Sequence, residues 1–82
     1  LQSAHRMFTA CVALARERRL VRVEVSNLPM LALTHLARAE LPAARTLAEQ
    51  AKSIARSLGD RRADALADVA LAEIHVLAGQ WN

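Results

Sequence analysis

The sequence predicts an all-α protein, built as a segment of a helical-repeat solenoid from four antiparallel helices. Ala and Leu are the commonest of its 82 residues, whereas Gly and Pro number two each. This composition favours helix over sheet. The chain also repeats itself at an interval of forty residues, since the motif Leu-Ala-x-x-His occurs at residues 31–35 and again at 71–75. Such an interval is typical of stacked helical units that cover one another's apolar faces.

The first half of the chain predicts helices at about 3–20 and 27–39. Apolar residues form one stripe along the first helix, and Asn27 precedes Pro29 as an N-cap precedes the first turn of a helix. Between the two helices, Val-Arg-Val-Glu-Val at 21–25 alternates like a short strand. An isolated five-residue strand has no pairing partner, so we expect an irregular linker there.

The second half predicts helices at about 42–58 and 61–78. Residues 42–58 have the clearest amphipathic pattern, and Pro42 suits a first turn. Gly59 is placed to end this helix in a left-handed conformation, and the side chain of Asp60 can cap the next one. Residues 61–78 are apolar on more than one side, so we expect neighbours to cover this helix from two directions.

Composition limits the chain to one small domain. Its only cysteine, Cys11, cannot form an internal disulfide, which fits a cytoplasmic protein, and its place on the apolar stripe suggests a small core residue. No apolar run approaches the length of a membrane span, so we expect no membrane association. Because the sequence stops within a repeat unit, we expect residues 1–82 to be a single repeat segment excised from a longer array.

With the helices paired, the chain resembles the tetratricopeptide repeat in its long form of about forty residues. The motif Leu-Ala-x-x-His-x-x-x-Ala at 31–39, and its Gly-ended counterpart at 71–79, match the first helix of that family. The small residues Ala44 and Ala51 match its second helix. His replaces the family's Tyr at both positions, and Leu28 and Asp68 replace its Trp.

The turn Leu-Gly-Asp-Arg-Arg at 58–62 is similar to turns in the repeat arrays of large bacterial regulators of the LuxR and maltose-activator type. Those regulators join a nucleotide-binding module, a helical repeat sensor and a DNA-binding helix-turn-helix. The resemblance implies a right-handed solenoid that serves as a protein-interaction or effector-sensing scaffold in a bacterial transcriptional regulator. Two alternatives stay open: the same scaffold in another signalling protein, and a free-standing four-helix domain with a basic nucleic-acid-binding edge.

The family's groove-facing positions, carried over to this chain, imply a partner groove that is mostly apolar. We therefore expect the partner to be a protein or peptide with an apolar segment. The alternative is that further repeats of a parent protein cover the same residues. The groove residues are Ser26, Pro29, Leu33, Leu36, Leu66, Val69, Glu73, Val76 and Leu77.

Arginines cluster near the ends of the predicted helices at 3–20 and 42–58, where a solenoid would place them on one edge. Such an edge could neutralise nucleic-acid phosphates, but cations at helix C-termini are also favoured by the helix dipole. Aromatic residues that could stack on bases are missing from this edge, so we do not expect this segment to bind nucleic acid. The basic edge comprises Arg18, Arg19, Arg22, Arg61 and Arg62.

No residue pattern predicts catalysis, a metal site or a cofactor. His35 and His75 should lie on adjacent helices about 10 Å apart, too far for shared coordination. The acids at 60, 64 and 68 share one helix face and could hold a cation, but acids in a first turn complement the helix dipole, and we expect Arg61 and Arg62 to neutralise them. No phosphate-binding loop or nucleophile with its base is present. We therefore expect a protein that is not an enzyme.

The end helices of a solenoid segment leave apolar faces uncovered. Here the exposed sets are Met7, Phe8 and Cys11 at one end, and Leu66, Val69 and Leu77 at the other. Terminal repeats usually need a polar cap for solubility. We therefore expect the chain to self-associate, most simply as a symmetric dimer.

Overall fold

The computed structural model describes residues 2–81, without the side chain of Trp81, and this part of the chain is all-α with no strand. Its four helices pack against one another, which confirms the prediction of an all-α protein with four helices. They are α1 (Gln2–Glu17), α2 (Val21–Ala37), α3 (Leu41–Leu58) and α4 (Arg61–Trp81). None of these helices is both long and apolar enough to cross a membrane.

The predicted linker at 21–25 is wrong, because α2 begins at Val21. The turn that precedes it needs no glycine: Arg19 itself adopts a left-handed conformation, with φ of 56°. The first turns of α2 then bury Val25 completely, against Ala55 and Ala63. This burial outweighs the strand preference of alternating β-branched residues.

The predicted start of the second helix at residue 27 is also wrong, because α2 already begins at Val21. Asn27 does not cap α2; its side-chain amide donates to the carbonyl of Val23 at 2.8 Å, inside the helix. Pro29 lies in the helix interior rather than in the first turn, and it is fully buried. Of the other predicted boundaries, those at 58 and 61 match the structure, and the rest differ by one to three residues.

The three turns between the helices share one geometry. Arg19, Ala39 and Gly59 all have left-handed backbones, with φ of 56°, 60° and 66°. In each turn the residue after the left-handed one donates its backbone N–H to the carbonyl of the residue five positions earlier in the chain. The N–O distances are 2.8 Å for residue 20, 3.0 Å for residue 40 and 2.9 Å for residue 60. This pattern is the Schellman motif. The helices after the turns therefore begin at residues 21, 41 and 61, so two helices make up the forty-residue interval.

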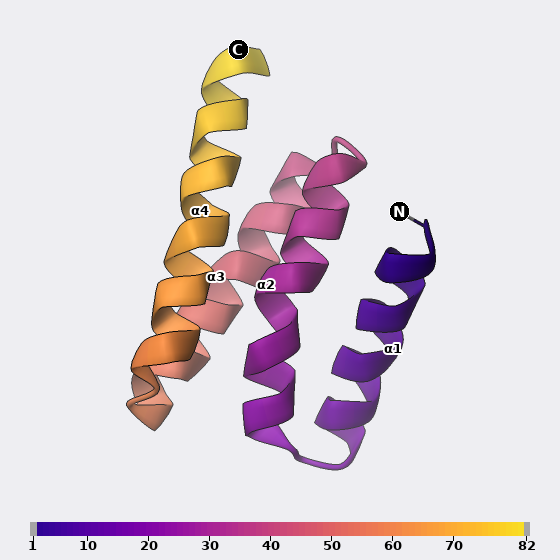
Figure 1. The fold of residues 1–82 in the computed structure, drawn as a ribbon, viewed down its shortest axis with the longest axis vertical. Helices are drawn as coiled ribbons and strands as arrows, with labels where there is room; N and C mark the ends of the chain where they lie inside the picture. The colour runs from indigo at the N-terminus through magenta and orange to yellow at the C-terminus, as the bar shows by residue number, and fades with distance from the viewer. Residues whose placement is uncertain (1, 82) are drawn as a thin grey trace.

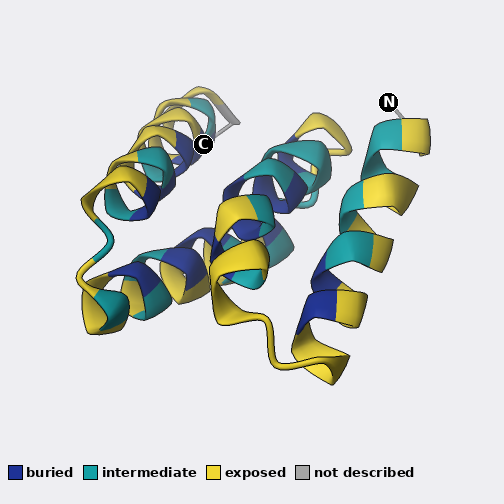
Figure 2. Ribbon diagram, turned by 60° about the horizontal axis from the view of Figure 1, so that its bottom comes forward, coloured by how far each residue is buried: buried dark blue, intermediate teal, exposed yellow. Residues whose placement is uncertain are grey.

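The helices form an open row rather than a closed ring. Each runs antiparallel to the next along the chain, and α4 runs beside α2 in the same direction (Figure 1). α3 packs against both α2 and α4, whereas α1 packs against α2. Within residues 2–81, the helix backbones of α1 and α4 do not pack together, and they lie at opposite ends of the molecule (Figures 1 and 2). The Cα atoms span 38 × 27 × 16 Å.

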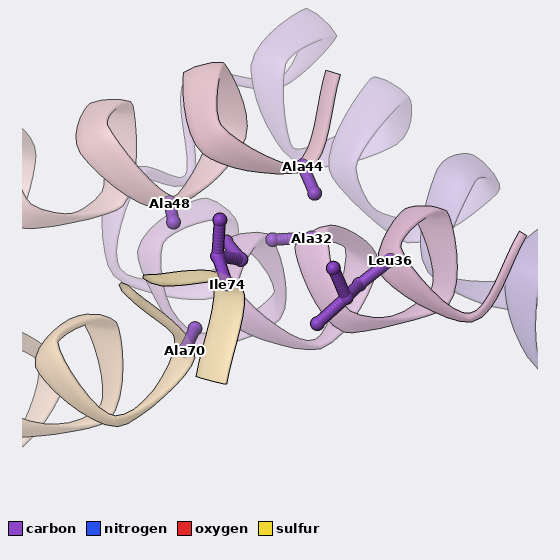
Figure 3. Close-up of a cluster of buried hydrophobic side chains, with 6 residues drawn as sticks. All are labelled: Ala32, Leu36, Ala44, Ala48, Ala70 and Ile74. Carbon is purple, nitrogen blue, oxygen red and sulfur yellow. The ribbon is translucent and has the colours of Figure 1, made fainter. Parts of the chain in front are cut away.

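The core follows the alanine face of α3. Small side chains allow neighbouring helices to approach closely, while larger residues of the facing helices fill the space. Ile74 of α4 inserts among Ala32 of α2 and the alanines Ala44 and Ala48 of α3 (Figure 3). A second cluster unites all four helices around Leu28. The α3 residues concerned, each fully buried, are Ala44, Ala48, Ala51 and Ala55.

Two sequence predictions about α3 and α4 are confirmed by the local structure. Gly59 ends α3 in the left-handed conformation. The carboxylate of Asp60 accepts a hydrogen bond from the backbone N–H of Ala63 at 3.0 Å, as an N-cap does. The α3–α4 junction is therefore held by both of the predicted elements.

Candidate interaction surface

The clearest candidate surface is one side of α4, which we call the α4 face. Each residue of the α4 face has a counterpart in α2, forty positions earlier in the chain, and α3 helps to cover these counterparts. The α2 residues are buried: Val25, Leu28, Pro29, Ala32 and Leu36. Their counterparts on the α4 face are exposed: Ala65, Asp68, Val69, Ala72 and Val76. Within residues 2–81 no helix covers α4 as α3 covers α2.

The α4 face is mostly apolar. Val69 is 57% exposed and Val76 is 59% exposed, values more typical of polar side chains. Val76 also lines a shallow hollow of about 360 Å³, together with Ala72, Glu73 and Leu77. Large exposed apolar side chains at helical spacing commonly mark a contact with another helix.

The predicted partner groove is divided by the structure. Its α4 members are accessible, because Val69, Glu73 and Val76 are exposed, and Leu66 and Leu77 are half-buried. Its α2 members are not all accessible. A correction concerns Pro29 and Leu36, which are buried and cannot contact a partner. Ser26 is exposed and Leu33 is half-buried. The accessible apolar surface therefore belongs to α4 rather than to a groove shared by both helices.

The predicted basic edge lies at one end of the molecule, where the α1–α2 and α3–α4 turns lie (Figure 1). All five arginines are exposed. Arg22 approaches Asp60 at 3.7 Å. Their relation to the helix dipoles differs from the expectation: Arg18 and Arg19 follow the C-terminus of α1, but Arg22, Arg61 and Arg62 lie in first turns, where the dipole disfavours cations.

The same ion pair occurs in both helical hairpins. Arg16 Nε lies 2.8 Å from Glu24 Oε2 between α1 and α2, and Arg56 Nε lies 3.8 Å from Asp64 Oδ2 between α3 and α4. Each pair joins residues that are equally distant from the turn between their helices. The two pairs are separated by forty residues, so the repeat extends to specific polar contacts.

Asp64 and Asp68 of α4 pair with Lys52 of α3. The sequence had instead suggested Arg61 and Arg62 as the partners of these acids. Lys52 Nζ donates to Asp64 Oδ1 at 2.9 Å and also to Asp68 Oδ1. These bonds, to Asp68 and then to Asp64, raise the pKa of Lys52, and the bond from Lys52 lowers the pKa of Asp64. The acidic side of α4 is therefore an inter-helix contact.

Two histidines meet between α1 and α2. The rings of His5 and His35 pack edge to face with centroids 4.6 Å apart. His5 Nδ1 lies 2.9 Å from Thr34 Oγ1, and His35 Nδ1 lies 2.8 Å from Glu40 Oε1. The forty-residue repeat had instead suggested His35 and His75 as neighbours. Within residues 2–81, no three His, Cys, Asp or Glu side chains are grouped as metal ligands.

The His5 contact predicts a loss of stability in mild acid. Desolvation lowers the pKa of His5 below its ordinary value of 6.5, and the charges of Arg38 and His35 lower it further, against an opposing effect of Glu40. The unfolded state therefore binds this proton more readily, so stability is lost as the pH falls from about 6.5 through the folded-state pKa. Glu40, whose pKa is lowered chiefly by its bond to His35, loses its contribution below its ordinary value of 4.5.

The measurement is the thermal midpoint of the chain and of its His5→Gln variant, between about pH 7.5 and pH 5.5. We expect the midpoint of the original chain to fall more steeply. The control is His75→Gln, the same change at an exposed histidine of α4, outside the contact of His5 with His35. Equal slopes for the original chain and His5→Gln would contradict this assignment.

The fold and the α4 face define an all-α, four-helix protein with an uncovered apolar helix surface. Comparisons of the chain with protein-family models, with curated proteins and with solved structures found no match.

Proposed function

We propose that this chain is a helical-repeat scaffold for protein–protein interaction, in which the α4 face binds a helix of a partner. The observation that supports this function is the correspondence between α2 and α4. At equivalent positions, α2 is buried beneath α3, whereas α4 exposes Val69, Ala72 and Val76. A partner helix on α4 would complete the packing that the chain already uses once.

The chemistry of the partner follows from the α2–α3 contact. α3 presents fully buried alanines at residues 44, 48, 51 and 55, a spacing that keeps them on one face of a helix. A partner helix with small residues at this spacing can approach α4 closely, and Val69 and Val76 then fill the space between the helices. Glu73 is exposed beside the α4 face and suits a basic residue on the partner.

The biological setting of this proposal rests on the resemblance. The forty-residue repeats and the turn at 58–62 are similar to the repeat arrays of LuxR- and maltose-activator-type regulators. This resemblance supports a scaffold that binds a partner or senses an effector within a bacterial transcriptional regulator. The same scaffold in another signalling protein is the alternative.

A synthetic peptide with the sequence of residues 41–58 provides the test, because this segment packs on α2 within the chain. We expect the peptide to shift the methyl NMR signals of Val69 and Val76 in the labelled protein. A peptide carrying Ala48→Glu and Ala51→Glu is the control and should not shift them. Absence of any shift with the unmodified peptide at millimolar concentration would contradict the proposed function.

The basic end supports a second candidate, nucleic-acid binding. The helix dipole does not account for Arg22, Arg61 and Arg62, since each lies in a first turn. Under this hypothesis Arg18→Ala and Arg61→Ala weaken binding to duplex DNA of any sequence, and each lost phosphate contact reduces the salt dependence by about 0.9 in log–log slope. Neither replacement should alter stability. Fluorescence anisotropy at low salt decides the matter, because absence of binding there excludes this candidate.

A further inference from the structure

A second apolar surface lies at the opposite end of the row of helices, on α1. Met7 is 54% exposed and Leu14 is 48% exposed. Cys11 lies between them in the helical sequence and is half-buried, and Arg18 follows after α1. We call these four residues the α1 face. Residues seven apart lie on the same side of a helix, so Met7 and Leu14 form one stripe.

The α1 face corresponds to the side of α3 that packs on α2. Forty residues after Met7 and Leu14 are Leu47 and Ile54, which pack against the cluster that contains Leu28. Forty residues after Cys11 is Ala51, a buried member of that cluster. α1 therefore presents to solvent the counterparts of Leu47 and Ile54, whereas Ala15, the counterpart of Ala55, is buried within the chain.

The two open faces are thus the two halves of one contact. The α4 face repeats the side of α2 that α3 covers, and the α1 face repeats the side of α3 that covers it. From this correspondence we infer that the α4 face of one copy of this chain binds the α1 face of a second copy. The joint would repeat the α2–α3 packing and continue the row of helices from one molecule into the next. This inference deepens the proposed function, on which it rests, by naming the partner.

The charges of the two faces favour this arrangement over a symmetric dimer. The α4 face carries Asp68, with Glu73 beside it, whereas the α1 face has Arg18 and no carboxylate. Two α4 faces in symmetric contact would bring their Glu73 carboxylates together, which is unfavourable. Asp68 enters the head-to-tail joint already bound to Lys52. Glu73 lies forty residues after Leu33, which is only half-buried in the α2–α3 contact. The Glu73 carboxylate therefore stays at the rim of the joint between the two molecules.

A head-to-tail contact has a consequence that a symmetric dimer lacks. Each molecule keeps one face free after joining, so assembly continues into open chains or rings. Replacing one residue with glutamate on either face should stop it. Val76→Glu blocks the α4 face and Leu14→Glu blocks the α1 face, and both residues are sufficiently exposed for each variant to keep its fold.

The test is sedimentation equilibrium of the original chain, the two variants and their equimolar mixture, with helical content checked by circular dichroism. We expect the original chain to grow beyond a dimer as its concentration rises, and each variant alone to be monomeric. The mixture should form a one-to-one heterodimer and nothing larger, because one intact face of each kind remains. Ala13→Glu, an exposed change on α1 outside the α1 face, is the matched control and should assemble like the original chain.

Three results would overturn the inference: an original chain that stays monomeric, a variant that still dimerises alone, or a mixture that forms no heterodimer. The peptide experiment separates this failure from failure of the proposed function. If the α4 face binds the peptide of residues 41–58 while the chain remains monomeric, the scaffold stands and its partner is another protein. If neither binding occurs, both proposals fail.

Discussion

Replacement of Leu28 with alanine should lower the free energy of unfolding by about 2–5 kcal/mol, the range for cavities left by large buried side chains. Leu28 is fully buried in the cluster that unites all four helices, with Val12, Ala51 and Ala67 among its neighbours. Alanines in this cluster cannot rotate to fill the space. Small domains are stable by only about 5–15 kcal/mol, so this one change removes a large share of the stability.

Urea denaturation followed by circular dichroism measures this effect, and Val76→Ala is the control. Val76 is 59% exposed, so its truncation should change the stability by less than about 0.5 kcal/mol. Equal midpoints for the two variants would contradict the position assigned to Leu28 in the core.

Replacement of Ala51 with leucine should destabilise the chain in the opposite way, by overpacking. Ala51 is fully buried in the middle of α3, where α3 contacts its neighbours. Extra methyl and methylene groups at this position must separate helices or force strained rotamers, which costs about 1–3 kcal/mol. Ala13→Leu, at an exposed position of α1, should leave thermal unfolding nearly unchanged. An Ala51→Leu variant as stable as the original chain would show that α3 is paired differently.

The fold class and the second half of the chain could be predicted because local signals there agree with the packing. In α3 the alanines recur with the helical period, Gly59 ends the helix, and Asp60 caps the next one. The start of α2 could not be predicted in this way. Arg19 adopts a left-handed turn that sequence statistics assign to glycine, and Val25 is helical because Ala55 and Ala63 cover it.

Part of the candidate surface follows from helical spacing alone. Val69 and Val76 share a face of α4 by period alone, and the structure exposes them. Pro29 and Leu36 also share a face of α2, but both are buried. Their burial results from packing between helices, which helical spacing does not reveal. The contact of His5 with His35 was missed because the linker placed at 21–25 hid the register of α1 against α2. Because α2 in fact begins at Val21, each residue of α1 lies opposite the residue of α2 that is equally distant from the α1–α2 turn. His5 therefore faces His35.

The central claim is that the helices form an open row whose end helices do not meet. Methyl nuclear Overhauser effects test it most directly, measured on dilute Leu14→Glu protein so that contacts between molecules do not contribute. The account predicts cross-peaks between Val25 and Ala55 and between Ala55 and Ala63. It predicts none between Met7 and Val69 or Val76. Cross-peaks from Met7 to these valines within one molecule would show a closed bundle with α1 against α4, and would contradict the open row and the scaffold proposed from it.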